Sequence, residues 1–438
     1  MAQPQMTPPG IHSRTTDESP DPHRRIIESF LTVRNLTEAL TSNLEPEDCG
    51  AQSMPDCSPA KWHMAHTTWF FETFVLGPHA KSYEPFHPQF SYLFNSYYNG
   101  IGERQARHQR GLLTRPTLDH VLAYRSHVNS SLVALVEAND PQNLKAIGEI
   151  IELGIHHEQQ HQELILTDLK HLFSQNILAP SYRPPLATEP SSIPALNWIP
   201  IPEGLHWIGA GPDGFHFDNE TPAHRVFIEE GLIADRLITN GEYRSFIADG
   251  GYTTPELWLD TGWATVQKEG WTKPLYWRGG PHDYRTFTLA GEQELQNHEP
   301  VAHISFLEAE AFARWAGARL PSESEWEITC GQIPIEGNFV ESGRFHPTAA
   351  GPALTKAPRQ AYGDLWEWTR SSYGPYPGYQ PEAGALGEYN GKFMCDQMVL
   401  RGGSCASSAA HLRPSYRNFF YPPDRWQFSG IRLAKDAQ

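Results

Sequence analysis

Residues 144–173, LKAIGEIIELGIHHEQQHQELILTDLKHLF, place apolar side chains at every third or fourth position, which is the spacing of an amphipathic helix. The same spacing occurs in three segments upstream, at residues 28–44, 65–76 and 117–137. Four such segments in succession predict a four-helix bundle, an architecture in which metal sites form from side chains on facing helices. We expect this all-α domain to span residues 23–178, after a disordered tail rich in proline, serine and threonine at residues 1–22.

The second half of the chain has a different pattern. A proline-rich stretch, residues 179–196, is the expected linker between two domains. Beyond it, residues 197–438 form short strand-like runs with many glycines and tryptophans, and one clear helical segment, SFLEAEAFARWAGA, lies at 305–318. This pattern predicts an α+β domain with much irregular structure.

Length and composition limit the possible functions. The chain has 438 residues, enough for two domains, and 39% of them are hydrophobic, as in globular proteins. Acidic residues outnumber basic ones by 51 to 34, and the net charge of −17 argues against nucleic acid or an anionic membrane as a main partner. The N-terminus lacks the apolar core of a signal peptide, no apolar run is long enough to span a membrane, and the five cysteines lack CxxC spacing. We therefore expect a cytoplasmic protein with reduced thiols, and the sequence indicates no oligomeric state.

A histidine motif lies in the middle of the long amphipathic segment. The run from His157 to His161, HEQQH, matches H-E-x-x-H, which in zinc proteases supplies two metal ligands and a glutamate base. Residues four apart share one face of a helix, so His157 and His161 can bind one ion. The longer protease motif has glycine three residues after the second histidine, where this chain has Leu164.

A third metal ligand is therefore expected upstream of the motif. His66, in PAKWHMAHTTWFFETF at 59–74, lies on a predicted helix of the same bundle, and His63, one turn earlier, is the alternative. A ligand set of His66, His157 and His161 leaves three positions of an octahedral ion open. Because neutral imidazoles leave the ion its full positive charge, such a site suits the recruitment of a thiolate and dioxygen.

Both halves of the chain resemble one enzyme family. PAKWHMAHTTWFFETF (59–74), FNSYYNGIGERQARHQRGLLTRP (94–116) and HHEQQHQELILTDLKH (156–171) resemble the DinB-like bundle of the sulfoxide synthases of ergothioneine biosynthesis. The second half resembles the partner domain of these enzymes, which is related to formylglycine-generating enzyme and has a C-type-lectin-like fold. The segments that carry this second resemblance are HISFLEAEAFARWAGARLPSESEWE (303–327), YGDLWEWT (362–369) and VLRGGSCASSAAHLRPSYRNFFYPPDRWQFSGIRLA (399–434).

The resemblance implies an iron enzyme. Members of this family hold non-haem iron(II) with three histidines that match His66, His157 and His161. They use O₂ to join the sulfur of cysteine or γ-glutamylcysteine to C2 of the imidazole of hercynine (Nα-trimethylhistidine), and the product is a sulfoxide. The implied cofactor is Fe(II), the co-substrate is O₂, the partners are small molecules, and Glu158 becomes a residue of the bundle or its metal surroundings instead of a base.

The resemblance also implies substrate contacts. Gln160 matches a position that hydrogen-bonds the substrate imidazole, and Asn418-Phe419-Phe420 matches the segment that receives hercynine. An aromatic face suits a trimethylammonium group through cation–π attraction. Arg107 and Arg110, in the long loop at 90–113, are the expected clamp for the carboxylate of the thiol substrate. Together with the neighbouring tyrosine pair they favour free cysteine as that substrate.

Tyr97 and Tyr98, in the same loop, are the expected catalytic residues. In one branch of the family, tyrosines at these positions donate a hydrogen bond or a proton during the oxygen chemistry, whereas in the other branch the catalytic tyrosine comes from the second domain. This chain has the loop tyrosines. It departs from the formylglycine-generating enzymes, whose paired active cysteines bind copper, because Cys395 and Cys405 do not reproduce that pair.

Three alternatives stay open at the level of the sequence. An ovothiol-type relative would use histidine and attack C5, although such enzymes usually carry a methyltransferase domain, which is not recognisable in these 438 residues. A zinc protease is supported only by H-E-x-x-H. The non-enzymatic alternative is a metal-binding bundle tethered to a lectin-like binding module.

Overall fold

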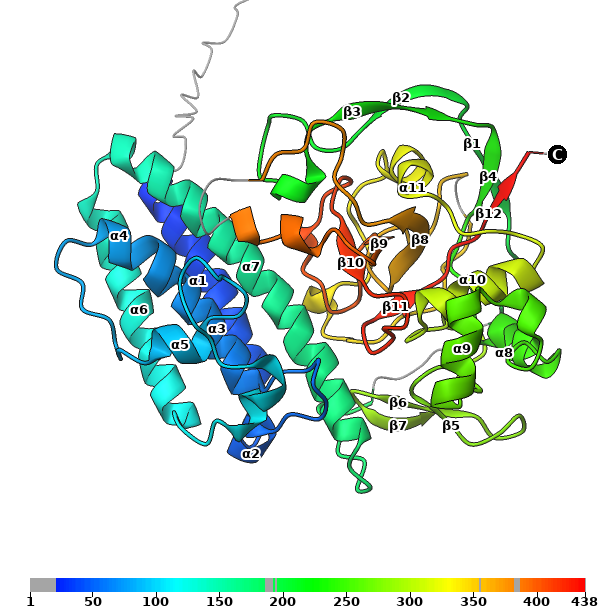
Figure 1. Ribbon diagram of the computed structural model, residues 1–438, viewed down its shortest axis with the longest axis horizontal. Coiled ribbons are helices and arrows are strands. Elements are labelled where there is room, and N and C mark those ends of the chain that lie inside the picture. Colours follow the sequence, from blue (N-terminus) through cyan, green and yellow to red (C-terminus); the bar gives the residue numbers. More distant parts are fainter. Residues whose placement is uncertain (1–20, 186–191, 194, 354–355, 382–386, 438) are drawn as a thin grey trace, which may run out of the picture.

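The computed structural model describes residues 21–185, 192–193, 195–353, 356–381 and 387–437 (Figure 1). A helical part is followed by a part in which short strands, helices and irregular segments alternate, as the sequence predicts. The expected disordered tail lies outside the described residues except for its last two, and Pro22 already begins the first helix. No helix in the described ranges combines the length and the apolar character that a membrane crossing needs.

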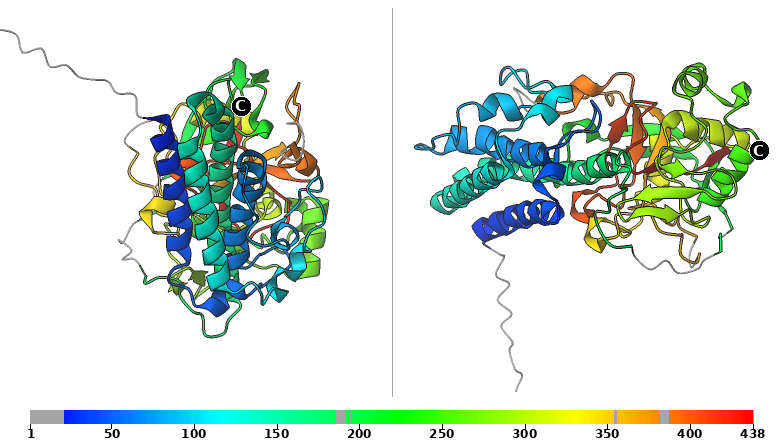
Figure 2. Two further views of the ribbon diagram at one scale, coloured as in Figure 1. Left: turned by 90° about the vertical axis from the view of Figure 1, so that its left-hand side faces the viewer. Right: turned by 90° about the horizontal axis from the view of Figure 1, so that it is seen from below.

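Within the described residues, four long helices lie side by side and form a bundle (Figures 1 and 2). They are α1 (Pro22–Thr41), α3 (Ala60–Phe71), α6 (Leu118–Ala138) and α7 (Pro141–Ser174). Asp21, Thr117 and Asp140 precede α1, α6 and α7, and their side chains accept hydrogen bonds from backbone N–H groups of the first turn. Helix α7 packs against α1 and α3, and α3 also packs against α6.

Shorter helical elements complete this domain. A π-helical turn, Glu72–Leu76, continues α3, and a 3₁₀ turn, Arg107–Leu112, closes the long loop before α6. The short α-helices are α2 (Pro46–Gly50), α4 (Gly77–His79) and α5 (Phe90–Phe94).

Helix α3 lies at the centre of the bundle. Every residue from Ala60 to Phe71 is buried, so this helix is enclosed on all sides and its aromatic side chains fill the core. Helix α7 approaches α3 closely at Gly154, where an added β-carbon would lie 2.4 Å from a ring carbon of Phe71. Because packed interiors do not tolerate such a contact, glycine at this position allows the helix with the H-E-x-x-H motif to lie directly against α3.

The second domain contains four small sheets in its described residues. The first has the order β1 (Trp198–Ile201), β4 (Gly231–Ala234) and β12 (Ala434–Asp436), and the second pairs β2 (Gly204–Ile208) with β3 (His224–Ile228). The third has the order β5 (Trp277–Arg278), β6 (Arg285–Thr288) and β7 (Gly291–Glu294). The fourth has the order β10 (Asn418–Phe420), β9 (Met398–Arg401), β8 (Trp366–Ser372) and β11 (Ser429–Gly430).

Four helices pack around these sheets: α8 (Asn240–Ala248), α9 (Asp260–Glu269), α10 (Phe306–Trp315) and α11 (Glu323–Cys330). Helix α10 is the segment that the sequence predicted as helical. It begins at Ser305, whose hydroxyl accepts the backbone N–H of Glu308 while the Glu308 carboxylate accepts the N–H of Ser305.

The two domains meet along α7, which lies between the rest of the bundle and the second domain (Figure 1). Apolar side chains of α7, among them Leu166 and Leu169, belong to one buried cluster with second-domain residues such as Phe428, and polar contacts lie beside them. The carboxylate of Glu163 accepts hydrogen bonds from Trp366, Ser404 and Ser407 of the second domain, and Nζ of Lys170 lies 2.6 Å from Nε2 of His303. The middle of α7, which carries the histidine motif, is therefore shared by both domains.

Candidate metal centre

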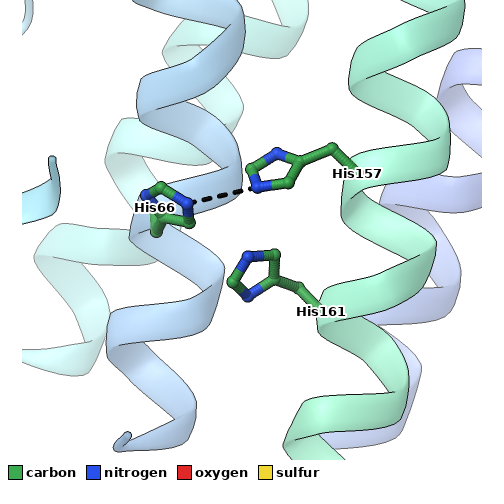
Figure 3. A group of neighbouring side chains, drawn as sticks. All are labelled: His66, His157 and His161. Carbon is green, nitrogen blue, oxygen red and sulfur yellow. Dashed lines mark hydrogen bonds between the residues drawn. The ribbon is translucent and has the colours of Figure 1, made fainter. Parts of the chain in front are cut away.

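Three buried histidines form a group between α3 and α7. His66 comes from α3, and His157 and His161 come from neighbouring turns of α7 (Figure 3). One ring nitrogen of each histidine lies within 4.8 Å of those of the other two, and Nε2 of His66 is 3.2 Å from Nε2 of His157. The three rings project toward one another from the facing helices (Figure 3).

The geometry and chemistry of this group fit a metal ion. Two imidazole nitrogens that bind one ion at about 2.1 Å lie about 3 Å apart when their bonds meet at a right angle, close to the 3.2 Å that separates His66 and His157. Burial lowers the pKa of all three histidines, that of His157 to about 3, so the rings are neutral, which is the form that binds metals. The group contains no carboxylate, and imidazole ligands suit iron, zinc, copper or nickel.

Hydrogen bonds on the outer side of two rings determine which nitrogen faces the centre. His66 donates from Nδ1 to the carbonyl oxygen of Phe94 at 2.6 Å, which leaves the lone pair on Nε2. Nδ1 of His161 lies 2.7 Å from Nδ1 of His63, and Nε2 of His63 lies 3.0 Å from the carboxylate of Asp168. Because a carboxylate accepts, His63 donates from Nε2 and accepts at Nδ1. His161 then donates from Nδ1 and keeps Nε2 for a metal.

His63, the alternative third ligand, therefore takes a supporting position. It lies one turn before His66 on α3 and contacts His161 and Asp168 rather than the centre of the group. His157 has no equivalent support, because its Nδ1 is buried without a partner in the described part of the chain.

Aromatic side chains enclose the histidines. The ring of His66 is stacked between Trp62, at a centroid distance of 4.7 Å, and Trp69, at 5.5 Å. Phe70 lies against His157 with ring centroids 5.0 Å apart. These rings fix the orientation of the histidines and exclude water from this side of the group.

Glu158 does not face the histidine group. Its carboxylate accepts hydrogen bonds from Arg34 at 2.8 Å and Arg125 at 2.9 Å, and Thr37 donates to it at 2.7 Å. Burial alone would raise the pKa of Glu158, but the two guanidinium groups outweigh burial and hold it at about 2. Because side chains of α1 and α6 bind the Glu158 carboxylate, it cannot act as the base of a zinc protease. The geometry therefore argues against the protease alternative.

Gln160 lies where the two domains meet. Its Nε2 donates to the hydroxyl of Tyr416 at 2.7 Å, and its Oε1 accepts a hydrogen bond from the hydroxyl of Tyr389. The ring of Tyr389 is buried 5.6 Å from the ring of His157, measured between centroids. Gln160 thus connects a residue of the second domain to the edge of the histidine group.

Tyr97 and Tyr98 stack on each other with ring centroids 4.7 Å apart. Tyr98 is fully buried against Trp69 and Phe74, and burial raises its pKa well above the usual value. Tyr97 is half-buried, and its ring lies 6.2 Å from that of Tyr389. Among the described contacts, none joins either loop tyrosine directly to the three histidines.

The two predicted arginines have different surroundings. Arg110 is buried, its guanidinium lies 3.4 Å from the ring centre of Trp62, and it donates to the hydroxyls of Ser58 and Ser96. Among the described residues no carboxylate lies within ion-pair distance of Arg110, although the charge of Asp168 acts on it from further away. Only the ring of Trp62 separates its guanidinium from His66. Arg107 is exposed and donates to the backbone carbonyl of Asp56.

The predicted hercynine segment forms strand β10 and is half-buried. Phe419 stacks on Tyr373 with centroids 4.0 Å apart, and Phe420 packs edge-on against Trp426. Asn418 uses its side-chain oxygen to accept the backbone N–H of Phe419. Phe393 links this strand to the tyrosine loop, because its ring contacts both Phe419 and Tyr97.

Of the second-domain residues near the site, Asn418-Phe419-Phe420 were predicted from the sequence, whereas Tyr389, Tyr416 and His411 were not. His411 and Tyr416 lie within the stretch 399–434 that carries the family resemblance, and Tyr389 lies in an irregular segment without periodicity. One signal was available for Asp168, which follows His161 by seven residues and therefore lies on the same face of α7.

Comparisons with known proteins match each half of the chain to a family. Residues 29–165 match the DinB superfamily, and residues 186–356 and 358–437 match the sulfatase-modifying factor enzyme 1-like domain. The chain is therefore of the class that joins a DinB-like helical domain to a domain of the formylglycine-generating-enzyme type, and the predicted fold class is confirmed.

Similarity over the full length narrows this class. The hercynine oxygenase of Mycolicibacterium thermoresistibile is 33% identical over 447 residues, which cover 95% of this chain and 96% of the relative. The hercynine oxygenase of Mycolicibacterium smegmatis is 38% identical over 65% of this chain and 71% of its own length, and that of Mycobacterium tuberculosis is 36% identical over 71% and 76%. The chain belongs to the hercynine oxygenase family, the sulfoxide synthases of ergothioneine biosynthesis, as its sequence motifs indicated.

Proposed function

We propose that this protein is an iron(II)- and O₂-dependent sulfoxide synthase that joins the sulfur of cysteine or γ-glutamylcysteine to C2 of the hercynine imidazole. The observation that carries the proposal is the group of three neutral imidazoles without a carboxylate, in a chain of this family. The overall reaction consumes the thiol, the imidazole C–H and one O₂. One oxygen atom ends in the sulfoxide and the other in water, which also takes the two hydrogens.

His66, His157 and His161 would hold the iron, with Asp168 and His63 keeping His161 in the metal-binding tautomer. When bound, iron(II) supplies a Lewis acid that lowers the pKa of a coordinated thiol and a redox centre that reacts with O₂. The stacked rings of Trp62 and Trp69 keep His66 rigid and limit access of water.

The residues around the histidines would orient the two organic substrates. Gln160 provides an amide beside His161 for the hercynine imidazole, and Asn418-Phe419-Phe420 provides an amide and aromatic faces for its carboxylate and trimethylammonium groups. Arg110 is a buried guanidinium that donates only to serine hydroxyls, which suits the carboxylate of the thiol substrate, with Arg107 at the exposed end of the same turn. Only the ring of Trp62 lies between the Arg110 guanidinium and the ring of His66. This short separation favours free cysteine over the longer γ-glutamylcysteine.

A tyrosine hydroxyl would hold or deliver the proton that the reaction needs. Tyr97 and Tyr98 are the loop residues expected in this role, and Tyr389 is a second-domain tyrosine in ring contact with His157. Burial raises the pKa of all three hydroxyls, so each keeps its proton at neutral pH and can donate it.

Anaerobic reconstitution tests the proposal. The protein is loaded with Fe(II), mixed with hercynine and cysteine, and then exposed to O₂, and products are identified by mass. We expect O₂ consumption and the hercynylcysteine sulfoxide. Intact iron loading with neither O₂ uptake nor a new sulfoxide would refute the function. Replacing hercynine by histidine tests the ovothiol-type alternative, and competition between cysteine and γ-glutamylcysteine identifies the thiol donor.

A further inference from the structure

A chain of hydrogen bonds runs from Tyr389 back into the bundle through residues that the proposed reaction does not use. Beyond Gln160, the hydroxyl of Tyr416 lies 3.0 Å from Nε2 of His411. Nδ1 of His411 then lies 3.0 Å from Nδ1 of His156, the first residue of the HHEQQHQE stretch on α7. The chain therefore passes from the second domain to α7, back to the second domain and again to α7.

The orientation of the Gln160 amide in the structure sets the direction of the other hydrogen bonds in the chain. The amide N–H of Gln160 can only donate, so the oxygen of Tyr416 accepts it and the Tyr416 hydrogen is free to point to Nε2 of His411. A neutral imidazole has one donor and one acceptor nitrogen. His411 therefore carries its hydrogen on Nδ1 and donates to Nδ1 of His156.

Both ends of the Gln160 amide are bound by tyrosine hydroxyls of the second domain. With Nε2 bound to Tyr416, the carbonyl oxygen must face Tyr389, whose hydroxyl donates to it. A flipped amide would reverse every bond of the chain together: Tyr416 would donate to Gln160 and accept from Nε2 of His411, and both histidines would have to change tautomer. The Gln160 amide therefore cannot flip independently of these residues.

Stacked rings hold both ends of the chain. His156 stacks on Phe215 with centroids 3.9 Å apart and an interplanar angle of 15°. Tyr389 stacks on Phe217 at 5.3 Å and 11°, and Phe215 and Phe217 contact each other edge-on. The side chains of His156, His411, Tyr416 and Tyr389 are all buried, so water does not compete strongly for these hydrogen bonds.

We propose that His156, His411 and Tyr416 are positioning residues that hold Gln160 and, through it, the hydroxyl of Tyr389 in one orientation at the edge of the histidine group. The members of the chain come alternately from α7 and from the second domain. Correct docking of the two domains is therefore a condition for a correctly oriented Gln160. The catalytic consequence of this role rests on the proposed function, whereas the orientation of the Gln160 amide does not.

Two substitutions, Tyr416→Phe and His411→Phe, each interrupt the chain of hydrogen bonds and keep an aromatic ring at the position. The matched control is Tyr362→Phe, because Tyr362 is equally buried in the second domain and its hydroxyl has no partner among the described residues. His411→Gln is the conservative rescue, since its amide can still accept the hydrogen of Tyr416. We expect Fe(II) binding to be unchanged in all four variants.

The first measurement is independent of catalysis. In protein labelled with ¹⁵N-glutamine, the side-chain amide signal of Gln160, assigned by its loss in Gln160→Leu, reports exchange of the amide hydrogens with solvent. We expect faster exchange in Tyr416→Phe and His411→Phe, and wild-type exchange in Tyr362→Phe. Unchanged exchange in the two cut variants would overturn the proposal.

The second measurement is the steady-state rate of sulfoxide formation. We expect kcat to fall by about tenfold in Tyr416→Phe and His411→Phe, as for the loss of one positioning hydrogen bond, with the KM for the thiol unchanged and most of kcat restored in His411→Gln. Equal rates in Tyr416→Phe and Tyr362→Phe would also contradict the role. If the wild-type protein forms no sulfoxide, the proposed function fails, and the amide exchange still decides whether the chain positions Gln160.

Discussion

Glu158 and His157 are neighbours on α7, yet they belong to two buried polar clusters that are held in different ways. In the Glu158 cluster the charges compensate one another, because the carboxylate accepts hydrogen bonds from Arg34, Thr37 and Arg125. The histidine cluster has no such charge pairing, because three imidazole rings come together and no carboxylate belongs to the group. The first cluster joins α1, α6 and α7 through paired charges, whereas the second presents three ring nitrogens in the arrangement of a candidate metal centre.

The comparison shows how one sequence motif divides into two roles. Successive residues on a helix point about 100° apart, so the glutamate of H-E-x-x-H faces α1 and α6 while its histidines face α3. In a zinc protease the glutamate has to reach the metal-bound water. Here the charges of Arg34 and Arg125 prevent that, and only the two histidines of the motif face the candidate metal centre.

We expect the largest effect from a substitution that removes one histidine of the cluster. In His66→Ala the ion would lose one of three ligands, so we expect no stoichiometric Fe(II) binding and no sulfoxide formation, measured by metal analysis and product mass. His171→Ala is the control, because His171 is a buried histidine of α7 whose Nδ1 contacts Ser53 and not the histidine group. Full iron retention in His66→Ala would remove His66 from the ligand set.

The second prediction tests which tyrosine near the histidine cluster donates a proton in the reaction. A positioned proton donor contributes about 10²- to 10⁴-fold to a rate, so its change to phenylalanine should cost a similar factor in sulfoxide formation. We expect the largest loss for Tyr389→Phe, since Tyr389 contacts His157, and smaller losses for Tyr97→Phe and Tyr98→Phe. If both loop variants keep the wild-type rate and the wild-type ratio of sulfoxide to sulfinate, the loop tyrosines have no catalytic role.

The third prediction concerns the free energy of unfolding and removes the negative charge of the Glu158 cluster. Glu158→Gln leaves Arg34 buried without a counter-charge and Arg125 with only the partly exposed Glu38, which should lower the free energy of unfolding by about 3–5 kcal/mol. Denaturant titration measures this, and Glu152→Gln, an exposed carboxylate on the same helix, is the control. The folded variant should still bind Fe(II). Loss of iron binding without loss of stability would show that the two clusters are not separate.

The sequence could predict the features that depend on the periodicity of individual helices. The period of α7 predicted the bundle, the shared face of His157 and His161, and a third ligand upstream. It could not show that α3 is enclosed on all sides, since periodicity reports an exposed face and α3 has none.

The rest of the site depends on how the two domains dock. Gln160 meets Tyr389 and Tyr416, which lie 229 and 256 residues further along the chain. Both belong to segments whose path is set by packing rather than by a repeating pattern. Contacts of this kind have no local signal, so the roles of Tyr389 and Tyr416 became visible only in three dimensions, whereas Asn418-Phe419-Phe420 could be predicted from the family resemblance.

The smallest expected effect tests whether the histidine cluster extends beyond its three ligands. Asp168 accepts hydrogen bonds from His63 and from the backbone N–H of Ser58, and through His63 it determines the tautomer of His161. In Asp168→Asn a neutral amide replaces the carboxylate, so the proton of His63 is no longer held on Nε2 by a negative charge.

A ligand histidine that loses this support typically costs about 10- to 100-fold in metal affinity, and we expect Asp168→Asn to bind Fe(II) weaker by such a factor in an anaerobic titration. The exposed Asp119→Asn controls for the loss of one negative charge. Sulfoxide formation should recover when Fe(II) is saturating, because the three ligands themselves remain. If saturating iron does not restore the rate, Asp168 acts on the reaction itself, and the boundary of the functional cluster lies further from the metal than its ligands suggest.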